Sequence, residues 1–300
     1  MSTQRQAVLL GLATVLLWST VASAFKIALR ELTPVQLLMI ATTVSVFVLL
    51  AILAAQGRVG QLTRLSGRQY LLSFGLGLVN PCLYYLILFA AFDRLPAQEA
   101  QPLNYTWALT LAYLSVPLLG HRLRPVDFLA GLVSYSGVWV IATRGDVFSV
   151  HFSDTLGVIL ALASTLVWAL YWIANTRDSR DPVLGLFLNF LFAWPVIVAI
   201  CLGIDGWPEA GAASMSAAVY VGVCEMGVAF VLWLMAMKRA EQTAQISNLI
   251  FISPFLSLVF IHFLVGEAIL ASTYVGLVLI VSGLLLQRVR RPRPRPAHPE

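Results

Sequence analysis

The chain alternates between long apolar segments and short polar ones over almost its whole length. Each apolar segment is close to the length of about 20 residues that a helix needs to cross a bilayer. Ten such segments can be counted, at 7–26, 35–55, 70–92, 97–119, 126–143, 155–175, 183–203, 214–237, 242–264 and 269–287. This pattern predicts an all-α polytopic membrane protein with ten transmembrane helices and little room for a soluble domain.

The composition agrees with this class. Hydrophobic residues make up 59% of the chain and charged residues only 11%, with a mean hydropathy of +0.86, whereas soluble domains carry roughly 25% charged residues. A chain this apolar cannot cover a globular surface, so its main partner is the lipid bilayer. The run that ends at Ala22-Ser23-Ala24 imitates a signal peptide, but it is long enough to span a membrane and we expect it to be retained.

The basic residues are divided unequally between the two expected sides of the membrane. If the N-terminus is cytoplasmic, fifteen of the nineteen lie in cytoplasmic segments and only four lie outside, namely Lys26, Arg30, Arg94 and Arg144. Because cytoplasmic loops carry the excess of Lys and Arg, both termini are expected in the cytoplasm, as in a protein of the bacterial inner membrane. The net charge of +5 then reflects topology and does not indicate a nucleic-acid partner.

Two pairs of similar segments reveal an internal repeat. LLWSTVASAF at 16–25 aligns with LVWALYWIAN at 166–175, and LAGLVSYSG at 129–137 aligns with YVGLVLIVSG at 274–283. Each half then holds five spans, and since five is odd, the second half must enter the membrane from the opposite side. Such inverted repeats are typical of secondary transporters, which bind their substrate near the midplane between the halves.

The expected domains follow from this repeat. They are a first five-helix repeat at 1–146, a second at 147–287, and a basic, proline-rich cytoplasmic tail at 288–300 that is expected to be disordered.

Polar residues occupy equivalent depths in the two halves. Asn80 in the third span corresponds to Glu225 in the eighth, and Asn104 in the fourth corresponds to Asn248 in the ninth. Polar groups buried in hydrocarbon are costly and tend to face a cavity or each other. We therefore expect these four side chains to share one cavity.

Helical spacing adds aromatic and amide side chains to the faces that carry these residues. The fourth span places Gln101 and Tyr105 beside Asn104 with Trp107 at the margin, and the first span carries a stripe that includes Phe25. No cofactor or metal ligand is expected. The candidate substrate-binding residues are Trp18, Asn80, Tyr84, Gln101, Asn104, Tyr105, Trp107, Trp168, Trp172, Glu225 and Asn248.

Structural explanations stay open for several of them. Trp107 and Trp168 can line a cavity or pack between helices, and Asn248 can serve as a hydrogen-bonding contact between helices. Asn80 precedes Pro81, so its amide can instead satisfy backbone groups freed by a kink. Glu225 is the only acid in the middle of any span, which makes a functional role the default interpretation.

Several features together resemble the drug/metabolite transporter superfamily of the EamA type. They are the ten spans in two halves, Trp18 and Trp168 in the first span of each half, the LVGE run at 264–267 followed by GLVLIVSG, and SPF at 253–255. Two departures show that the halves are not identical. The first half has GHR at 120–122 where the repeat expects GE, and Ala108-Leu109 where the second half has Ser253-Pro254.

Within this superfamily, LYYLILFAAF followed by LNYTWALT is most similar to the YddG-type exporters of aromatic amino acids. The resemblance implies that Tyr84, Tyr105, Trp107 and Trp168 line a central cavity.

The predicted function is export of amino acids, with aromatic ones favoured, by alternating access. An aromatic cavity also suits a broad exporter of other small metabolites or amphipathic drugs, and this remains the alternative. An enzyme is disfavoured because the four histidines lie in loops, at span ends or in the tail, and no nucleophile pairs with a base at matched depth. A channel is disfavoured because it has no need of an inverted repeat.

Overall fold

The structure is a computed structural model of the 300-residue chain. It describes residues 3–120, 125–148, 152–175, 178–240, 246 and 249–288. Helices and their connections account for all of these residues, and no strand occurs among them. The predicted all-α fold is therefore confirmed for the described part of the chain.

Seven helices are long and apolar enough to cross a membrane, which confirms the membrane-protein class. Two of the seven are composite, since α3 (Gly67–Gly77) runs through the π-helix η2 (Leu78–Leu83) into α4 (Tyr84–Arg94), and α10 (Ala212–Tyr220) runs through the π-helix η3 (Val221–Ala229) into α11 (Phe230–Arg239). The other five are α1 (Thr3–Ala28), α2 (Pro34–Ala55), α7 (Pro125–Ala142), α8 (Thr155–Asn175) and α9 (Pro182–Ile204).

The remaining helices are shorter than the sequence pattern predicted. The expected span 97–119 is divided by Thr106 into α5 (Ala97–Tyr105) and α6 (Trp107–Leu119), so it does not count among the long apolar helices. The expected span 242–264 begins outside the described residues. Its described part comprises η4 (Ile250–Ile252), α13 (Ser253–Phe260) and η5 (Ile261–Val265). The next helix is α14 (Ala271–Arg288).

Local sequence signals explain where several helices begin. Thr33 and Gln36 form a capping box at the start of α2, with Pro34 in its first turn. Asp181 caps α9 by accepting hydrogen bonds from the next backbone amides, and Pro182 follows it. A short 3₁₀ helix, η1 (Val59–Arg64), connects α2 to α3.

Two of the three described π-helices, η2 and η3, interrupt their spans near the middle, whereas the third, η5, follows α13 at the end of its span. In η2, Asn80 has a non-helical backbone (φ −142°, ψ 115°) directly before Pro81, whose missing N–H prevents a regular helix. η3 contains no proline and instead carries Gly222 and Gly227 around Glu225. A π-turn inserts an extra residue into the helix and is frequent at functional sites.

Glycines allow close backbone contact beside η2 and η3. A Cβ atom on Gly77 would overlap the carbonyl oxygen of Asn189 in α9, and one on Gly222 would lie 2.6 Å from the carbonyl oxygen of Ala41 in α2. Small residues at helix interfaces are the usual means of close packing in membranes. Each broken span therefore packs closely against a neighbouring helix, at Gly77 directly before η2 and at Gly222 within η3.

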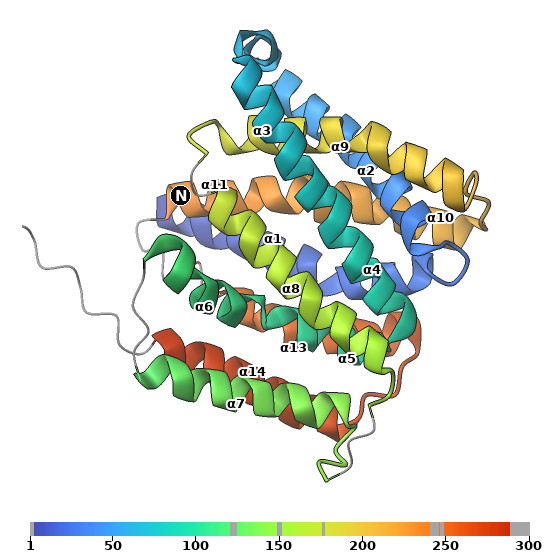
Figure 1. The fold of residues 1–300 in the computed structure, drawn as a ribbon, viewed down its shortest axis with the longest axis vertical. Coiled ribbons are helices and arrows are strands. Elements are labelled where there is room, and N and C mark those ends of the chain that lie inside the picture. The colour runs from blue at the N-terminus through green and yellow to red at the C-terminus, as the bar shows by residue number, and fades with distance from the viewer. Residues whose placement is uncertain are drawn as a thin grey trace, which may run out of the picture.

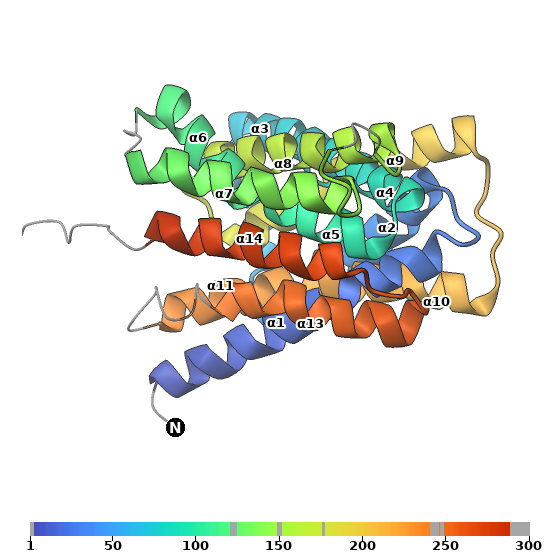
Figure 2. The ribbon, with the colours of Figure 1, turned by 90° about the horizontal axis from the view of Figure 1, so that it is seen from below.

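Helices α7 and α14 lie side by side, as both ribbon views show (Figures 1 and 2). A Cβ on Gly276 would lie 2.6 Å from the carbonyl oxygen of Gly137, and one on Gly283 would lie 2.5 Å from that of Ala130. Ser134 also donates a hydrogen bond across the interface to the carbonyl of Ile280 (3.1 Å). These glycines let the two backbones approach closely, and the buried side chains of Ile141 and Ile280 pack against them.

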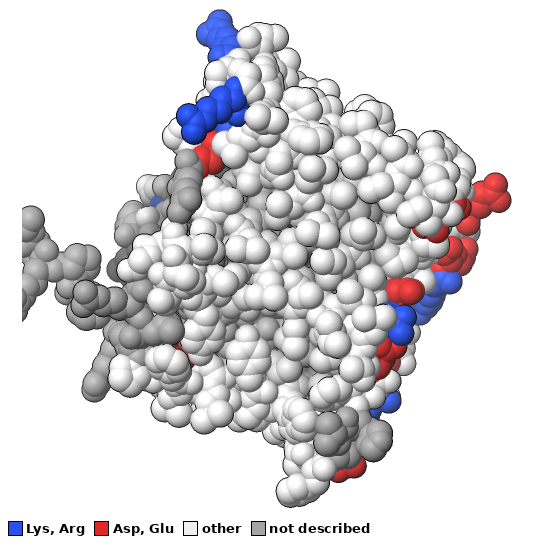
Figure 3. All heavy atoms as spheres, in the orientation of Figure 1, with Lys and Arg blue, Asp and Glu red and all other residues white. Residues whose placement is uncertain are grey.

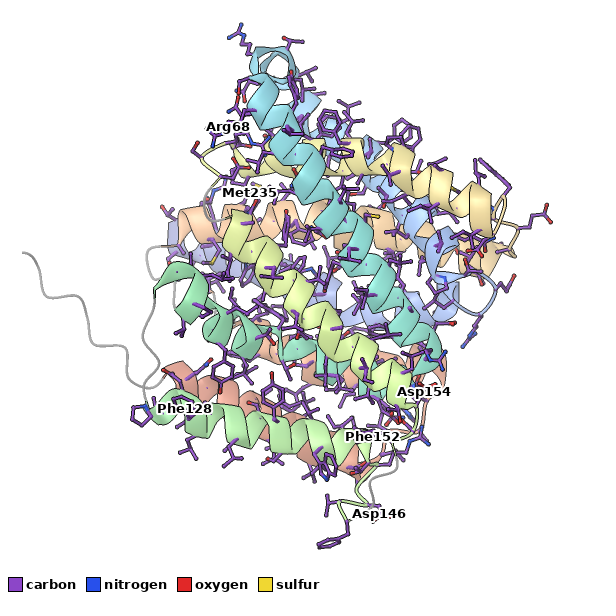
Figure 4. All side chains as sticks on the ribbon, viewed as in Figure 1. Arg68, Phe128, Asp146, Phe152, Asp154 and Met235 are labelled. Atoms are coloured by element: carbon purple, nitrogen blue, oxygen red, sulfur yellow. The ribbon has the colours of Figure 1, made fainter. Side chains whose placement is uncertain are left out.

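Most helices run between two ends of the molecule. The N-terminus marks one of them (Figures 1 and 2), and we call the opposite one, where α1 ends and α8 begins, the far end. Charged side chains gather at opposite margins of the face in Figure 3, and the broad region between them is uncharged. Arg68 and Asp154 lie near opposite ends in Figure 4. An apolar belt between two charged ends is what a bilayer requires.

A candidate substrate cavity

One cavity lies among α1, α4, α5, α6, α8, η3, α11 and η4. Its lining residues are Trp18, Val21, Phe25, Tyr84, Leu88, Gln101, Asn104, Tyr105, Trp107, Trp168, Glu225, Phe230 and Ile250. Eight of the eleven candidates from the sequence are among them, drawn from both halves of the chain. The structure thus brings together residues that the sequence places more than 200 positions apart.

Aromatic rings form a continuous wall of the cavity. Tyr84 stacks on Trp168 with ring centroids 4.4 Å apart and an interplanar angle of 27°. Phe230 contacts Trp168 at 5.9 Å and meets Trp18 edge to face at 6.2 Å. Rings at these separations attract one another and offer further faces and edges to an aromatic ligand.

Glu225 supplies the only charge on the cavity lining among the described residues. One carboxylate oxygen, Oε1, accepts a hydrogen bond from the hydroxyl of Tyr85 at 3.2 Å. The other, Oε2, is buried and has no hydrogen-bond partner in the described part of the chain. A buried carboxylate oxygen without a partner is costly, so this oxygen is available to a cationic or hydrogen-bonding ligand.

The amides of the cavity come from α5. Asn104 donates from its Nδ2 atom to the hydroxyl of Ser164 in α8 (3.0 Å), and that hydroxyl donates in turn to the carbonyl of Ala161 (2.7 Å). Gln101 makes no hydrogen bond within the described residues, so its amide remains available. The break at Thr106 starts a new helix at Trp107 and brings its ring to the same cavity.

Three candidates from the sequence do not line the cavity as described. Asn80 is fully buried, and its side-chain amide makes no hydrogen bond in the described part of the chain. The same holds for the amide of Asn189, and both amides lie beside the hydroxyl of Tyr171. The Asn80 side chain therefore does not satisfy backbone groups freed by Pro81. Trp172 packs edge to face on Trp168 at 5.8 Å. Asn248 lies outside the described residues.

Several lining residues escaped the sequence interpretation. Val21, Leu88, Phe230 and Ile250 are apolar residues of apolar spans, and nothing in their pattern separates them from lipid-facing positions. The hydrogen bond from Tyr85 to Glu225 joins residues 140 positions apart. No spacing rule predicts such a contact.

Two charged side chains hold the turn between α4 and α5 at the far end. The ammonium of Lys26 donates to the carbonyls of Phe92 (2.8 Å) and Leu95 (3.1 Å), where α4 ends. The carboxylate of Glu267 accepts from the amides of Ala97 (2.8 Å) and Gln98 (3.1 Å), where α5 begins. Each charge has the sign that its helix terminus favours.

Gln98 extends this contact toward α14. Its side-chain oxygen accepts from the amide of Leu270 (2.8 Å) and the hydroxyl of Thr273 (3.1 Å), and its nitrogen donates to the carbonyl of Ala268 (2.9 Å). Because α5 carries Gln101 and Asn104, these contacts also fix the position of the cavity amides.

A ring cluster and an ion pair add to the closure of the far end. Phe25 packs edge to face on Phe89 and Phe92 at 4.9 and 5.1 Å. Asp154, at the start of α8, accepts from the backbone amide of Gly157 and pairs with Arg94 at 3.0 Å. These two interactions, the Gly157 hydrogen bond first, lower the pKa of the Asp154 carboxyl.

Three known proteins are similar to this chain. The aromatic amino acid exporter YddG of Ancylobacter novellus is 28% identical over 239 residues, which are 78% of this chain and 80% of that protein. A probable terminal-alkyne amino-acid exporter of Streptantibioticus cattleyicolor is 25% identical over 210 residues, 68% of each. A crystal structure with 25% sequence identity superimposes with a TM-score of 0.65, covering 96% of this chain and all of the other.

The sequence profile of the EamA-like transporter family matches the chain twice, at residues 5–143 and 155–288. Together the matches cover nearly all of the sequence, and the similar exporters point to the same class. A family of membrane transporters also accounts for the long apolar helices and for the cavity that they enclose. The chain therefore belongs to the EamA-like transporter family.

Proposed function

We propose that this protein is a secondary transporter that exports amino acids, with aromatic ones favoured, across the cytoplasmic membrane by alternating access. The cavity carries this proposal, because it combines an aromatic wall with a partnerless carboxylate oxygen on Glu225. Such a site offers stacking to a ring and a counter-charge to an ammonium group. The names of the two similar exporters support the same substrate class.

The cavity residues divide into two groups by chemistry. The substrate ring is proposed to lie against the aromatic residues, and its polar end against Gln101, Asn104 and Glu225. The aromatic group comprises Trp18, Tyr84, Tyr105, Trp107 and Trp168.

The three candidates away from the described lining keep more distant roles in this proposal. Trp172 would support the ring of Trp168 from the side away from the cavity, and Asn80 would lie buried beside Tyr171. Asn248 stays a prediction from its correspondence to Asn104.

An inverted repeat of ten spans is part of the proposal, with halves at 1–146 and 147–287. Two observations support it: one family profile matches each half, and Asn80 and Glu225 each lie in a π-helix that interrupts a span. The contact of Gly77 with α9 corresponds to that of Gly222 with α2. In this arrangement α5 and α6 together form the fourth span.

Alternating access requires that the cavity open to one side at a time. In this structure the Lys26 and Glu267 contacts hold the α4–α5 turn at the far end. We propose that the far end faces away from the cytoplasm, because Lys26 and Arg30 belong to the few basic residues outside the cytoplasmic group. Release of an exported substrate would then require these contacts to break.

Transport into proteoliposomes tests the proposal. Purified protein should give saturable uptake of radiolabelled tryptophan and phenylalanine, and each should compete with the other. Threonine should be taken up with lower affinity because it lacks a ring. If a cationic dye competes as well as phenylalanine does, the broad-exporter alternative is favoured, and non-saturable flux of all substrates would contradict a carrier.

A further inference from the structure

We propose that the cavity prefers arylalkylamines to the corresponding amino acids. These are compounds with an aromatic ring on a short chain that ends in an ammonium group and lacks a carboxylate. This inference rests on the proposed function, since it concerns the same cavity, but it names a substrate class that differs in charge. It follows from the charges and hydrogen-bond donors that surround the site.

The charges around the cavity are one-sided. Glu225 lines it, and no Lys, Arg or His does so among the described residues. The site therefore has a counter-charge for an ammonium group and none for a carboxylate.

The ammonium group of an amine would be satisfied in two ways. Oε2 of Glu225 lacks a hydrogen-bond partner among the described residues, while the Tyr85 hydroxyl holds the other oxygen. The surrounding rings, including Trp18 and Trp168, can also present their faces to a cation, which is attractive within about 6 Å of the ring centre. A single cation thus gains both a carboxylate and aromatic faces.

Binding the carboxylate of an amino acid in the same cavity would be less favourable than binding an ammonium group. Asn104 already donates one N–H of its amide to Ser164 (3.0 Å). The donors left on the lining are all neutral: the second N–H of Asn104, the amide of Gln101, the tyrosine hydroxyls and the indole N–H groups. Moving a carboxylate into a site without a cation is costly. Being bonded to the same carbon as the ammonium group, it would also lie close to Glu225 and be repelled by it.

Three indoles separate these contributions because they share one ring. Tryptamine carries only the ammonium group, tryptophan carries both charges, and indole-3-propionate carries only the carboxylate. Their binding to the purified protein in detergent would be measured by calorimetry at pH 7, where amines of this kind are protonated and carboxylates are ionised. The expected order of affinity is tryptamine, tryptophan, indole-3-propionate, with about tenfold between successive ligands.

Glu225→Gln removes the proposed counter-charge while keeping the shape of the side chain. It should weaken tryptamine by about tenfold or more and leave indole-3-propionate unchanged or tighter. Glu31→Gln is the matched control, since Glu31 caps the start of α10 by accepting from Gly211 (2.6 Å) and Ser214 (3.1 Å) and does not line the cavity. The control should leave all three affinities unchanged.

The order of affinity of the three indoles is measured on the unaltered protein, so the proposal can be tested even if Glu225→Gln fails to insert into the membrane. Tryptophan binding as tightly as tryptamine, or more tightly, overturns the preference for amines and leaves the amino-acid proposal in place. An equal loss for all three ligands in Glu225→Gln also overturns it. If none of the three indoles binds, both this inference and the proposed function fail.

Discussion

The two broken spans, α3–η2–α4 and α10–η3–α11, share the same backbone interruption but carry different side chains at it. In both, a π-helix interrupts the span and a glycine packs against the backbone of a neighbouring helix. Gly77, directly before η2, packs on α9, and Gly222, at the start of η3, packs on α2. The side chains at corresponding positions differ. Asn80 is buried behind the aromatic wall, whereas Glu225 reaches the cavity.

This difference suggests how one architecture can serve many substrates. The glycine contacts and the break fix the position of each span, and the residue in the π-turn can change without altering that packing. In the first half the uncharged amide of Asn80, next to Pro81, does not line the cavity, and Tyr84 and Tyr105 do. In the second half, with no proline in the turn, a carboxylate supplies the only charge on the described lining.

The largest effect is expected at the glycine contacts. Gly77→Ala should destabilise the protein by about 3 kcal/mol, because the added Cβ would overlap the Asn189 carbonyl and neither backbone can easily move. Gly75→Ala in the same helix is the control, since nothing lies within 4 Å of its added Cβ, and it should be neutral or stabilise by up to about 1 kcal/mol. Thermal unfolding in detergent measures both, and equal melting temperatures for the two variants would contradict the packing described here.

Replacing the two π-turn side chains separates their roles. Glu225→Gln should reduce the initial rate of tryptophan transport by about tenfold or more, because it removes the only charge on the described lining. Asn80→Ala should change the rate by less than about threefold, since its amide is away from the cavity and makes no hydrogen bond in the described part of the chain. A larger loss for Asn80→Ala than for Glu225→Gln would reverse the assignment.

The aromatic wall is tested at Trp107. Its truncation to alanine removes apolar contact worth about 1 to 3 kcal/mol, which is roughly 5- to 150-fold in affinity, and the loss should be larger for tryptophan than for threonine. Trp207, 71% exposed, gives the control variant Trp207→Ala. Competition against radiolabelled tryptophan measures both, and unchanged selectivity in Trp107→Ala would show that this ring only packs.

The smallest effect concerns the far end, where Glu267 binds the amides at the start of α5. In the sequence alignment of the two halves, the position of Glu267 falls on His121. Glu267→Gln weakens the hydrogen bonds to the start of α5. The free energy of opening the cavity toward the far end should therefore fall by about 1 kcal/mol, which raises the fraction of open molecules about fivefold. A cysteine introduced at Leu88, in a variant lacking the native cysteines, reports this as faster labelling by an impermeant thiol reagent. Glu31→Gln should leave the labelling rate unchanged, and an equal increase in that variant would indicate general loosening.

Much of the cavity could be predicted because polar and aromatic residues stand out in apolar spans. Trp18, Asn104 and Glu225 are conspicuous for this reason, and the repeat aligned their depths. Local backbone changes defeated the finer predictions. Helical spacing assumes 3.6 residues per turn, and the π-turn at Asn80 inserts an extra residue, so Tyr84 lines the cavity whereas Asn80 does not.

Other features depend on contacts between distant segments. The break at Thr106 leaves the apolar pattern of 97–119 intact, so the sequence predicted a single helix there. Lys26 was interpreted only as one of the external charges, whereas its ammonium binds the carbonyls at the end of α4. The Lys26 contact depends on how α1 meets the end of α4, which periodicity does not encode.

A structure of the protein with bound tryptophan tests the central claim most directly, because it locates the substrate relative to the two broken spans. We expect the indole ring beside Trp168 and Tyr84, and the ammonium group within about 3.2 Å of the Glu225 carboxylate. Tryptophan bound instead beside Asn80 and Asn189, or outside the cavity on the surface of the helices, would contradict the account.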